Sequence, residues 1–228
     1  MRRATLLFVI MLLLHNVCLA ASVDWGYETI SEEEKAAVLE QLNLQLLPDD
    51  SRKTSLRCFD VGLDGAVAIG TASGSGCILY VYDSSGAFRY GYSFHADGAY
   101  GLEFRGDMLA LFLLRGNVFV LFDSEGNCVD FQKITNVEQN HVKAKELLNR
   151  STKIIGEKTY SLQRDMDIGD SYSRLVLKEK SGECTVLYDV TSQNKTGQII
   201  MVAFIACFFG FVIWGCIEKK KSVSGGRK

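Results

Sequence analysis

Four aromatic side chains recur at every second position in one short segment, at Phe88, Tyr90, Tyr92 and Phe94. Because alternate residues of a β-strand point to the same side, this spacing places the four rings on one face of a strand. An exposed aromatic stripe can bind sugars or peptides, whereas a covered one packs against a neighbouring strand or helix. We treat these residues as a candidate ligand-binding stripe, although packing is the commoner role of such a pattern.

Four cysteines lie between the two apolar ends of the chain, at Cys58, Cys77, Cys128 and Cys184. An even number in a secreted domain suggests disulfides, and four cysteines allow three pairings. However, Cys128 and Cys184 hold equivalent places in two repeats, whose sheets would stack about 10 Å apart, beyond the roughly 7 Å Cα limit for a disulfide. Cys58 and Cys77 fall on strands about 9.6 Å apart. We predict small buried thiols, and a crossed pairing such as Cys58 with Cys184 stays open.

No residue pattern predicts a catalytic, cofactor-binding or metal-binding site. His95 and His141 have no cysteine, histidine or acid at metal-ligand spacing. The acidic stretch 165–170 resembles a calcium loop, but its glycine falls at the fifth place instead of the sixth and no glutamate closes the loop. Gly169-Asp170-Ser171 looks like a hydrolase nucleophile turn, yet no histidine follows it before the apolar C-terminal run. This weakens a Ser-His-Asp site without excluding it.

The first 20 residues have the features of a secretory signal peptide. Two arginines precede an apolar run from Ala4 to Leu14, and small residues at Cys18–Ala21 suit cleavage by a signal peptidase. The alternative is an uncleaved signal anchor, but His15 and Asn16 interrupt the apolar run. We predict a signal peptide over residues 1–20.

The other end of the chain predicts a single transmembrane helix over residues 199–217. These 19 residues carry no charge and would form a helix about 28 Å long, enough to cross the hydrocarbon layer. Three lysines at 219–221 follow directly and favour a cytoplasmic tail, residues 218–228. Residues 21–198 are therefore expected outside the cell, with 191–198 as a juxtamembrane linker.

The charge of the expected outer region is acidic. Without Glu218 and the seven Lys and Arg residues of the two ends, residues 21–198 carry 26 acidic and 18 basic side chains, a net charge of −8. This balance disfavours nucleic acid as a partner. A content of 47% hydrophobic and 23% charged residues excludes a disordered chain and indicates an ordinary globular core.

The segment 21–56 is predicted to hold a short helix and a linker. Ser31 opens a capping box with acids in the first turn, and apolar residues follow at helical spacing to Leu47. We expect a helix over about 32–46 that ends at Pro48 and packs on the outer domain. A linker from Asp49 to Thr54 follows.

From Cys58 onward, short apolar runs alternate with turns, and three stretches share one pattern of strand, turn and strand. Their matching turns, Asp83–Gly86, Asp123–Gly126 and Glu179–Gly182, lie 40 and then 56 residues apart. The longer interval reflects an insertion at 135–151 that is polar and partly helical around 142–148. We predict three antiparallel four-stranded units at about 57–100, 101–134 and 153–190.

The apolar pattern also predicts how the units are covered. The strands of the second unit, Leu109–Leu114 and Val118–Phe122, are continuously apolar, as in a sheet buried on both faces. We therefore expect the second unit in the middle of a face-to-face stack. The strands of the third unit alternate between apolar and polar residues, so one of its faces should meet water and the stack should stay open.

A repeat near 40 residues with four short strands resembles the blades of bacterial β-propellers. The resemblance covers residues 57–190 and implies a mainly β fold, a partial propeller with a short N-terminal helix and a C-terminal transmembrane helix. Three blades are fewer than the usual minimum of about four for a closed ring. The whole layout resembles single-span surface proteins of Gram-positive gut bacteria, a group that carries no assigned activity.

Two functions from different classes follow. The favoured one is a non-enzymatic, membrane-anchored module that binds, docks or senses a ligand outside the cell. Its partner would be another protein or a second copy, held through the outer faces of the units. The alternative is a membrane-anchored surface hydrolase with a site of acids and tyrosines. An uncompensated buried acid pair would favour the enzyme, and a broad apolar or aromatic patch would favour the binding module.

Overall fold

The computed structural model describes residues 25–73, 76–164 and 172–192. The predicted signal peptide at 1–20, the span at 199–217 and the tail at 218–228 lie outside these residues, as does nearly all of the 191–198 linker. In the ranges that are described, no helix is both long and apolar enough to cross a membrane.

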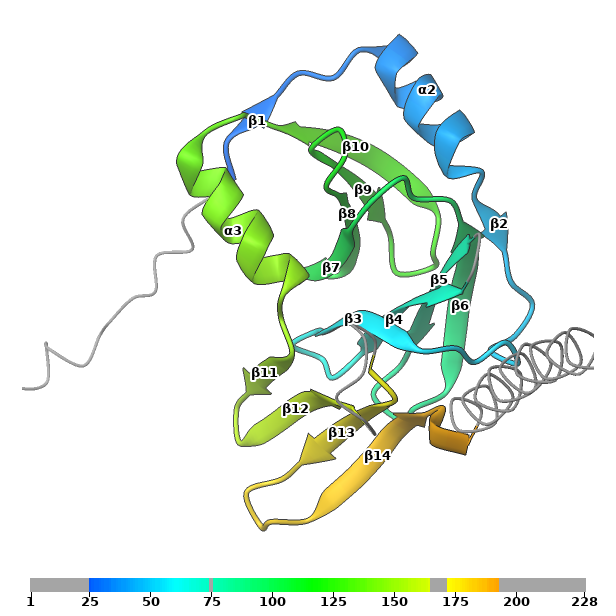
Figure 1. Ribbon diagram of the computed structural model, residues 1–228, viewed down its shortest axis with the longest axis vertical. Coiled ribbons are helices and arrows are strands. Elements are labelled where there is room, and N and C mark those ends of the chain that lie inside the picture. Colours follow the sequence, from blue (N-terminus) through cyan, green and yellow to red (C-terminus); the bar gives the residue numbers. More distant parts are fainter. Residues whose placement is uncertain (1–24, 74–75, 165–171, 193–228) are drawn as a thin grey trace, which may run out of the picture.

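Over these described residues the fold is mainly β, with three antiparallel sheets and two helices, and none of the three sheets is closed (Figure 1). The first sheet has the order β2-β6-β5-β4-β3, the second β1-β10-β9-β8-β7 and the third β11-β12-β13-β14. The core strands of the first sheet are β3 (Leu56–Val61), β4 (Val67–Ser73), β5 (Gly76–Tyr82) and β6 (Phe88–Phe94). Those of the second are β7 (Tyr100–Arg105), β8 (Met108–Leu113), β9 (Val118–Phe122) and β10 (Cys128–Ile134). The third consists of β11 (Thr152–Ile155), β12 (Lys158–Gln163), β13 (Arg174–Lys178) and β14 (Cys184–Asp189).

The repeated turns explain why each unit forms a meander of hairpins. Asp123 accepts hydrogen bonds at Oδ1 from the backbone N–H groups of Glu125 and Asn127, and Asp83 does the same in the first sheet. The turn glycine Gly126 has φ +91°, a conformation that favours glycine. These local bonds reverse the chain at the predicted places.

The N-terminal segment contributes strands that the sequence pattern did not predict. Helix α2 (Glu32–Leu42) has the expected capping box at Ser31, but it ends at Asn43, whose φ of 45° is left-handed, and not near residue 46. The next residues form β2 (Gln45–Leu46), a fifth strand on the first sheet. Likewise β1 (Tyr27–Glu28) pairs with β10 and makes the second sheet five-stranded. The segment therefore joins the edges of two sheets.

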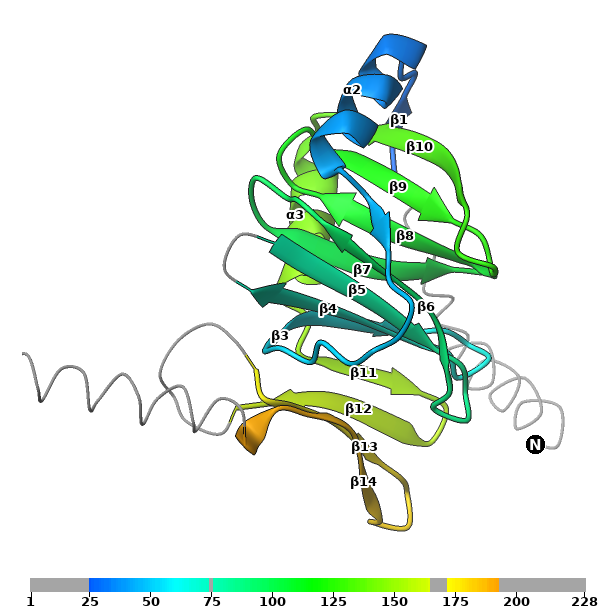
Figure 2. The ribbon, with the colours of Figure 1, turned by 90° about the vertical axis from the view of Figure 1, so that its right-hand side faces the viewer.

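The first sheet lies in the middle, so the expectation that the second unit occupies the middle is wrong. One face of the first sheet packs on the second sheet, where Leu79 and Leu111 share a buried cluster. Its other face packs on the third sheet, where Tyr80 and Leu175 share another. Figure 2 shows the same order, from α2 and the second sheet at the top, through the first sheet, to β14 at the bottom.

The second sheet is nevertheless covered on both faces, because the insertion supplies its second cover. Helix α3 (Glu138–Leu148) includes the expected helical stretch 142–148 and packs through Leu147 against Phe112 and Phe119 on the face turned away from the first sheet. Trp25 adds an edge-to-face contact with Phe119 at 5.0 Å between ring centroids. A continuously apolar strand indicates that both faces of its sheet are buried, but the pattern does not indicate whether a sheet or a helix packs on each face.

The third sheet has one open side, as its alternating pattern predicts. Its inner residues pack on the first sheet, while most of β14 is exposed, including Val186 at 49%. Strands β3, β7 and β11, the first strand of each unit, lie near one another, and β3 contacts both of the others (Figure 1). The first strands of the three units therefore lie close together, and the remaining strands of each unit extend away from them.

Candidate functional site

The predicted aromatic stripe lies inside the molecule. Tyr90, Tyr92 and Phe94 point into the core between the first and second sheets, with Tyr90 and Phe94 buried and Tyr92 half-buried. The Tyr92 ring lies 5.3 Å from that of Phe122, and its hydroxyl donates a hydrogen bond to the carbonyl of Gly126 at 2.6 Å. Burial raises the pKa of the Tyr90 hydroxyl above its usual value.

Phe88 is separated from the other three rings by a β-bulge. The register between β5 and β6 shifts between Val81 and Tyr82, so that Tyr82 pairs with Phe88 where an unbroken ladder would place Arg89. Phe88 therefore turns to the opposite face and contacts the rings of Tyr80 and Tyr82, each at 6.2 Å between centroids. Packing between sheets accounts for all four aromatic residues.

The four cysteines are free thiols, as predicted, and the crossed pairing of Cys58 with Cys184 does not form. Cys58 and Cys77 are buried and Cys128 is partly exposed. Burial raises the pKa of the Cys58 thiol well above 9.0. Cys184 is exposed, contrary to the expectation of a buried residue, because it begins the open edge strand β14.

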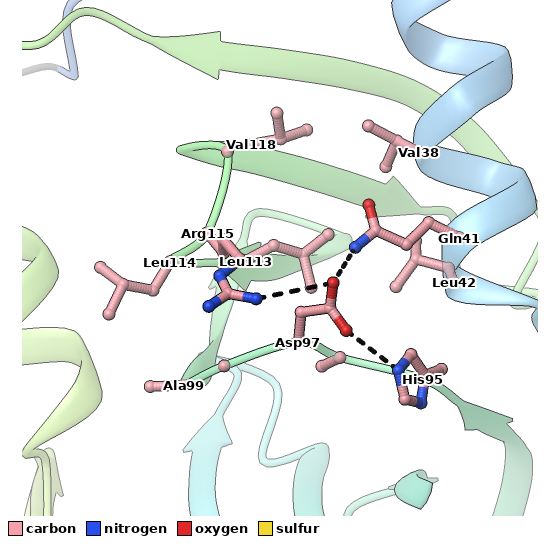
Figure 3. Close-up of a pocket in the computed structure, with 13 residues that line it drawn as sticks. Val38, Gln41, Leu42, His95, Asp97, Ala99, Leu113, Leu114, Arg115 and Val118 are labelled. Atoms are coloured by element: carbon pink, nitrogen blue, oxygen red, sulfur yellow. Dashed lines mark hydrogen bonds and ion pairs between the residues drawn. The ribbon is translucent and has the colours of Figure 1, made fainter.

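A small cavity of about 90 Å³ between α2 and the loops after β6 and β8 contains a histidine and a carboxylate (Figure 3). Asp97 lies 3.0 Å from His95 Nε2, accepts a hydrogen bond from Gln41 at 2.6 Å and forms a looser ion pair with Arg115 at 3.7 Å. The described residues that line the cavity include no serine, threonine or cysteine. We assign this cluster to the attachment of α2 to the two loops.

A cleft of about 560 Å³ lies where α3 meets β3 and β7. Its walls come from segments that are distant in the sequence, and the end of α3 beside β7 and above β11 is visible in Figure 1. The basic residues of the lining are Arg57, His141, Lys145, Arg150 and Arg164. No aspartate or glutamate is among the described residues that line it. The described lining of the cleft is therefore positive, although the chain as a whole carries a net charge of −2.

Two arginines are held at the cleft by aromatic rings. The Arg57 guanidinium lies over the ring of Tyr100 at 5.8 Å, and that of Arg164 lies over Tyr172 at 4.7 Å. An isolated β-bridge between Leu56 and Tyr172 brings these two segments together. A guanidinium that lies over a ring can still donate from its N–H groups, an arrangement that suits phosphate or carboxylate groups.

The third wall is one side of α3, where His141 and Lys145 are one turn apart. A basic residue in the last turn of a helix also offsets the negative end of the helix dipole, which is a structural reason for Lys145. That reason does not apply to Arg57 or Arg164, because they lie on β3 and after β12. The helix dipole therefore explains only part of the positive charge of the lining.

Arg150 connects the cleft to the centre of the molecule. Its Nη1 donates to Oδ1 of Asp60 at 2.5 Å, and Lys153 donates to both Asp60 oxygens at 2.8 and 2.9 Å. The backbone N–H of Phe104 donates to Asp60 Oδ2 at 2.7 Å. Asp60 is completely buried. This single carboxylate on β3 therefore binds groups from the second sheet, the third sheet and the segment after α3.

Sequence reasoning missed the basic cleft because its residues come from separate segments. A local signal was present: residues 143–164 contain six Lys or Arg and two Glu, inside an otherwise acidic region. A count of charge cannot show which of these side chains converge, and the contribution of Arg57 has no sequence signal at all. What the lining can do chemically is bind an anion through several charged donors.

Comparison with known proteins assigns no ligand to the cleft. No protein-family model, no curated protein and no solved structure matches this chain.

Proposed function

We propose that this protein is a non-enzymatic binding or sensing module, anchored in the membrane and exposed outside the cell, whose ligand site is the basic cleft. The observation that carries the proposal is the lining: five basic residues from four segments and no acidic residue among those described. Among the described residues, only Arg150 of these five has a carboxylate partner, Asp60. Clustered cations in a concave site attract anions and repel one another without a ligand. The ligand is therefore a small molecule with phosphate or carboxylate groups.

The partial propeller belongs to the same proposal. Three meanders of four strands, with β3, β7 and β11 close together, support blade-like units around a shared line. In such an arrangement side chains from several units meet near the first strands, and the cleft lies there, against Tyr100 and Arg57. Membrane anchoring and exposure outside the cell are supported by the sequence patterns at 1–20 and 199–217.

We do not propose the alternative function, a membrane-anchored surface hydrolase. Asp60 is the buried carboxylate of the described residues, and Arg150 and Lys153 balance it. The acid and tyrosine contact at Asp50 and Tyr82 is a hydrogen bond of 3.0 Å that fastens the segment before β3 to the first sheet. Neither arrangement is an uncompensated acid pair of the kind that a general acid and base require.

Equilibrium dialysis of radiolabelled pyrophosphate against the full chain in detergent tests the proposed site. We expect saturable binding to one site per chain. Arg57→Ala and Arg164→Ala should each weaken binding about tenfold, because loss of one charge-assisted hydrogen bond costs at least about 1.5 kcal/mol. Lys178→Ala is the matched control, since it removes the same charge from an exposed position at the end of β13. Equal losses in all three variants would show nonspecific attraction and overturn the assignment of the site.

A further inference from the structure

The buried Asp60 holds the three sheets together with an unbalanced charge. It lies on β3 of the first sheet and accepts hydrogen bonds from Phe104 of the second, from Lys153 on β11 of the third and from Arg150 just before β11. Two cations share one carboxylate, so this group carries an excess of one positive charge. Arg150 also lines the cleft. The cleft and the junction of the sheets therefore have one side chain in common.

More positive charge faces the same space. Arg57, Lys145 and Arg164 have no carboxylate partner among the described residues. They lie on the first sheet, on α3 and at the end of β12, so their mutual repulsion acts across the junction where the third sheet meets the first. Repulsion between like charges is strongest where water is partly excluded, as in a cleft. An anion between them would replace this repulsion with attraction.

We propose that a multivalent small oxyanion, with two or more phosphoryl or carboxyl groups, binds in the cleft and strengthens the attachment of the third sheet to the first. This inference rests on the proposed anion-binding function and adds the valence of the ligand and the consequence of binding. The anion contacts Arg150 on one side and Arg57, Lys145 or Arg164 on the others, and so ties the segment before β11 to β3 and α3. By linkage, whatever binds the attached form better also stabilises it.

The number and the spread of the cations set the valence. Four guanidinium or ammonium groups line the cleft from different elements, and Asp60 neutralises only one of them in part. A monovalent anion can neutralise a single group and leaves the others in repulsion. The cavity of about 560 Å³ also holds more than one oxyanion group, since a water occupies about 30 Å³ of liquid volume. A ligand with two or more charged groups can span the walls.

Hydrogen exchange of the full chain in detergent, followed by mass spectrometry, measures the attachment directly. With saturating pyrophosphate we expect slower exchange of backbone amides in β11 and β12 and in β3, and unchanged exchange in β9. Citrate should give the same protection, because it carries several carboxylates, and acetate at equal ionic strength should give none. Protection by acetate would overturn the requirement for a multivalent ligand. Protection by pyrophosphate but not by citrate would restrict the ligands to phosphoryl compounds and overturn the proposal that carboxyl groups also bind.

Two variants separate binding from coupling. Arg150→Gln removes the shared side chain but leaves Asp60 paired with Lys153, so the chain keeps its central ion pair. We expect it to bind pyrophosphate about tenfold more weakly, as expected for one lost charge contact, and at saturation to show little added protection of β11 and β12. Lys145→Ala, which removes a cleft cation on α3, should also weaken binding, yet keep the protection at saturation, because Arg150 and Arg57 still tie the segment before β11 to β3. Lys178→Ala serves as the control for loss of one positive charge.

The results distinguish the two proposals. Binding of pyrophosphate without protection of the third sheet overturns this inference and leaves the anion-binding function standing. Full protection in Arg150→Gln at saturation overturns the role of Arg150 in the coupling. Absence of pyrophosphate and citrate binding to the unaltered chain overturns both proposals.

Discussion

Asp60 is the residue on which the junction of the three sheets depends most directly. Its carboxylate is fully buried and accepts from two cations and one backbone N–H. Asp60→Ala leaves Arg150, Lys153 and the Phe104 N–H without their acceptor. Breaking a buried ion pair by removing one partner costs about 3–5 kcal/mol. We expect urea denaturation to show a loss of this size in the free energy of unfolding.

The matched control is Asp64→Ala. Asp64 is an exposed turn residue that accepts one hydrogen bond from the backbone N–H of Ala66 at 3.0 Å. Its removal should cost about 1 kcal/mol or less. Similar losses in the two variants would contradict the central role of Asp60.

Buried protonated groups predict a loss of stability in alkali. Burial raises the pKa of the Cys58 thiol above 9.0 and that of the Tyr100 hydroxyl above 10.0. The folded chain keeps these protons at pH values where the unfolded chain releases them, so stability is full below pH 9 and falls as the pH rises. We expect the Tm to decrease from pH 9 to 11, and Cys58→Ala to show a shallower decrease from its own starting value. A Tm that stays constant over this range would contradict the burial of both groups.

At the scale of elements, α3 does two things: it covers the second sheet and forms a wall of the cleft. Leu147 fills the space above Gly101 on β7, where a Cβ would lie 2.9 Å from the leucine side chain. Leu147→Ala should lower the free energy of unfolding by about 2–5 kcal/mol, because it opens a cavity between helix and sheet. It should also weaken pyrophosphate binding, since the wall that carries Lys145 loses its support. Thermal and chemical denaturation together with dialysis measure both effects.

Val142→Ala is the control for that helix. Val142 is 51% exposed on the same helix, so its truncation should change stability by less than about 1 kcal/mol and leave anion binding unchanged. A large effect of Val142→Ala would mean that α3 is sensitive along its whole length and not through its packed face.

At the scale of the whole molecule, the stack depends on dry interfaces between sheets. Leu111 is completely buried between the second and first sheets. Leu111→Asp should prevent folding, because an unpaired charge there costs several kcal/mol. Val129→Asp, at a 51% exposed position on β10, should fold normally. Circular dichroism and size-exclusion elution of the two variants decide the matter, and a folded, monodisperse Leu111→Asp protein would contradict the packing of these sheets.

The orientation in the membrane is a further prediction for the whole molecule. The apolar run 199–217 and the lysines behind it predict that residues 21–198 lie outside the cell. Protease added to intact cells should therefore degrade or release fragments that carry the Asp123 turn. Protection of these fragments until the cells are lysed would reverse the orientation.

Local backbone chemistry made the strand units predictable from the sequence. The Asp and Gly residues of the first two repeated turns close a hairpin by bonds within five residues, and short apolar or alternating stretches mark the strands between the turns. The predicted unit boundaries at 57, 101 and 153 therefore fall within one residue of β3, β7 and β11. The short strands β1 and β2 escaped prediction because two residues carry no periodic pattern, and they form only where an existing sheet edge offers partners.

The positions of the candidate site residues depend on contacts that form only in the folded chain. A single bulge turned Phe88 away from Tyr90 and Tyr92, and no alternation in the sequence marks that shift. Several sheet faces are apolar, and the order of the sheets depends on which of these faces pack together. The hydrophobic effect is not directional, so an apolar pattern does not specify which face packs against which. The sequence determined the strands, their turns and the charges that each segment carries. Only the tertiary structure brought Arg57 to Lys145, Arg150 and Arg164, because charges separated by about 90 to 110 residues meet through packing and not through any local rule.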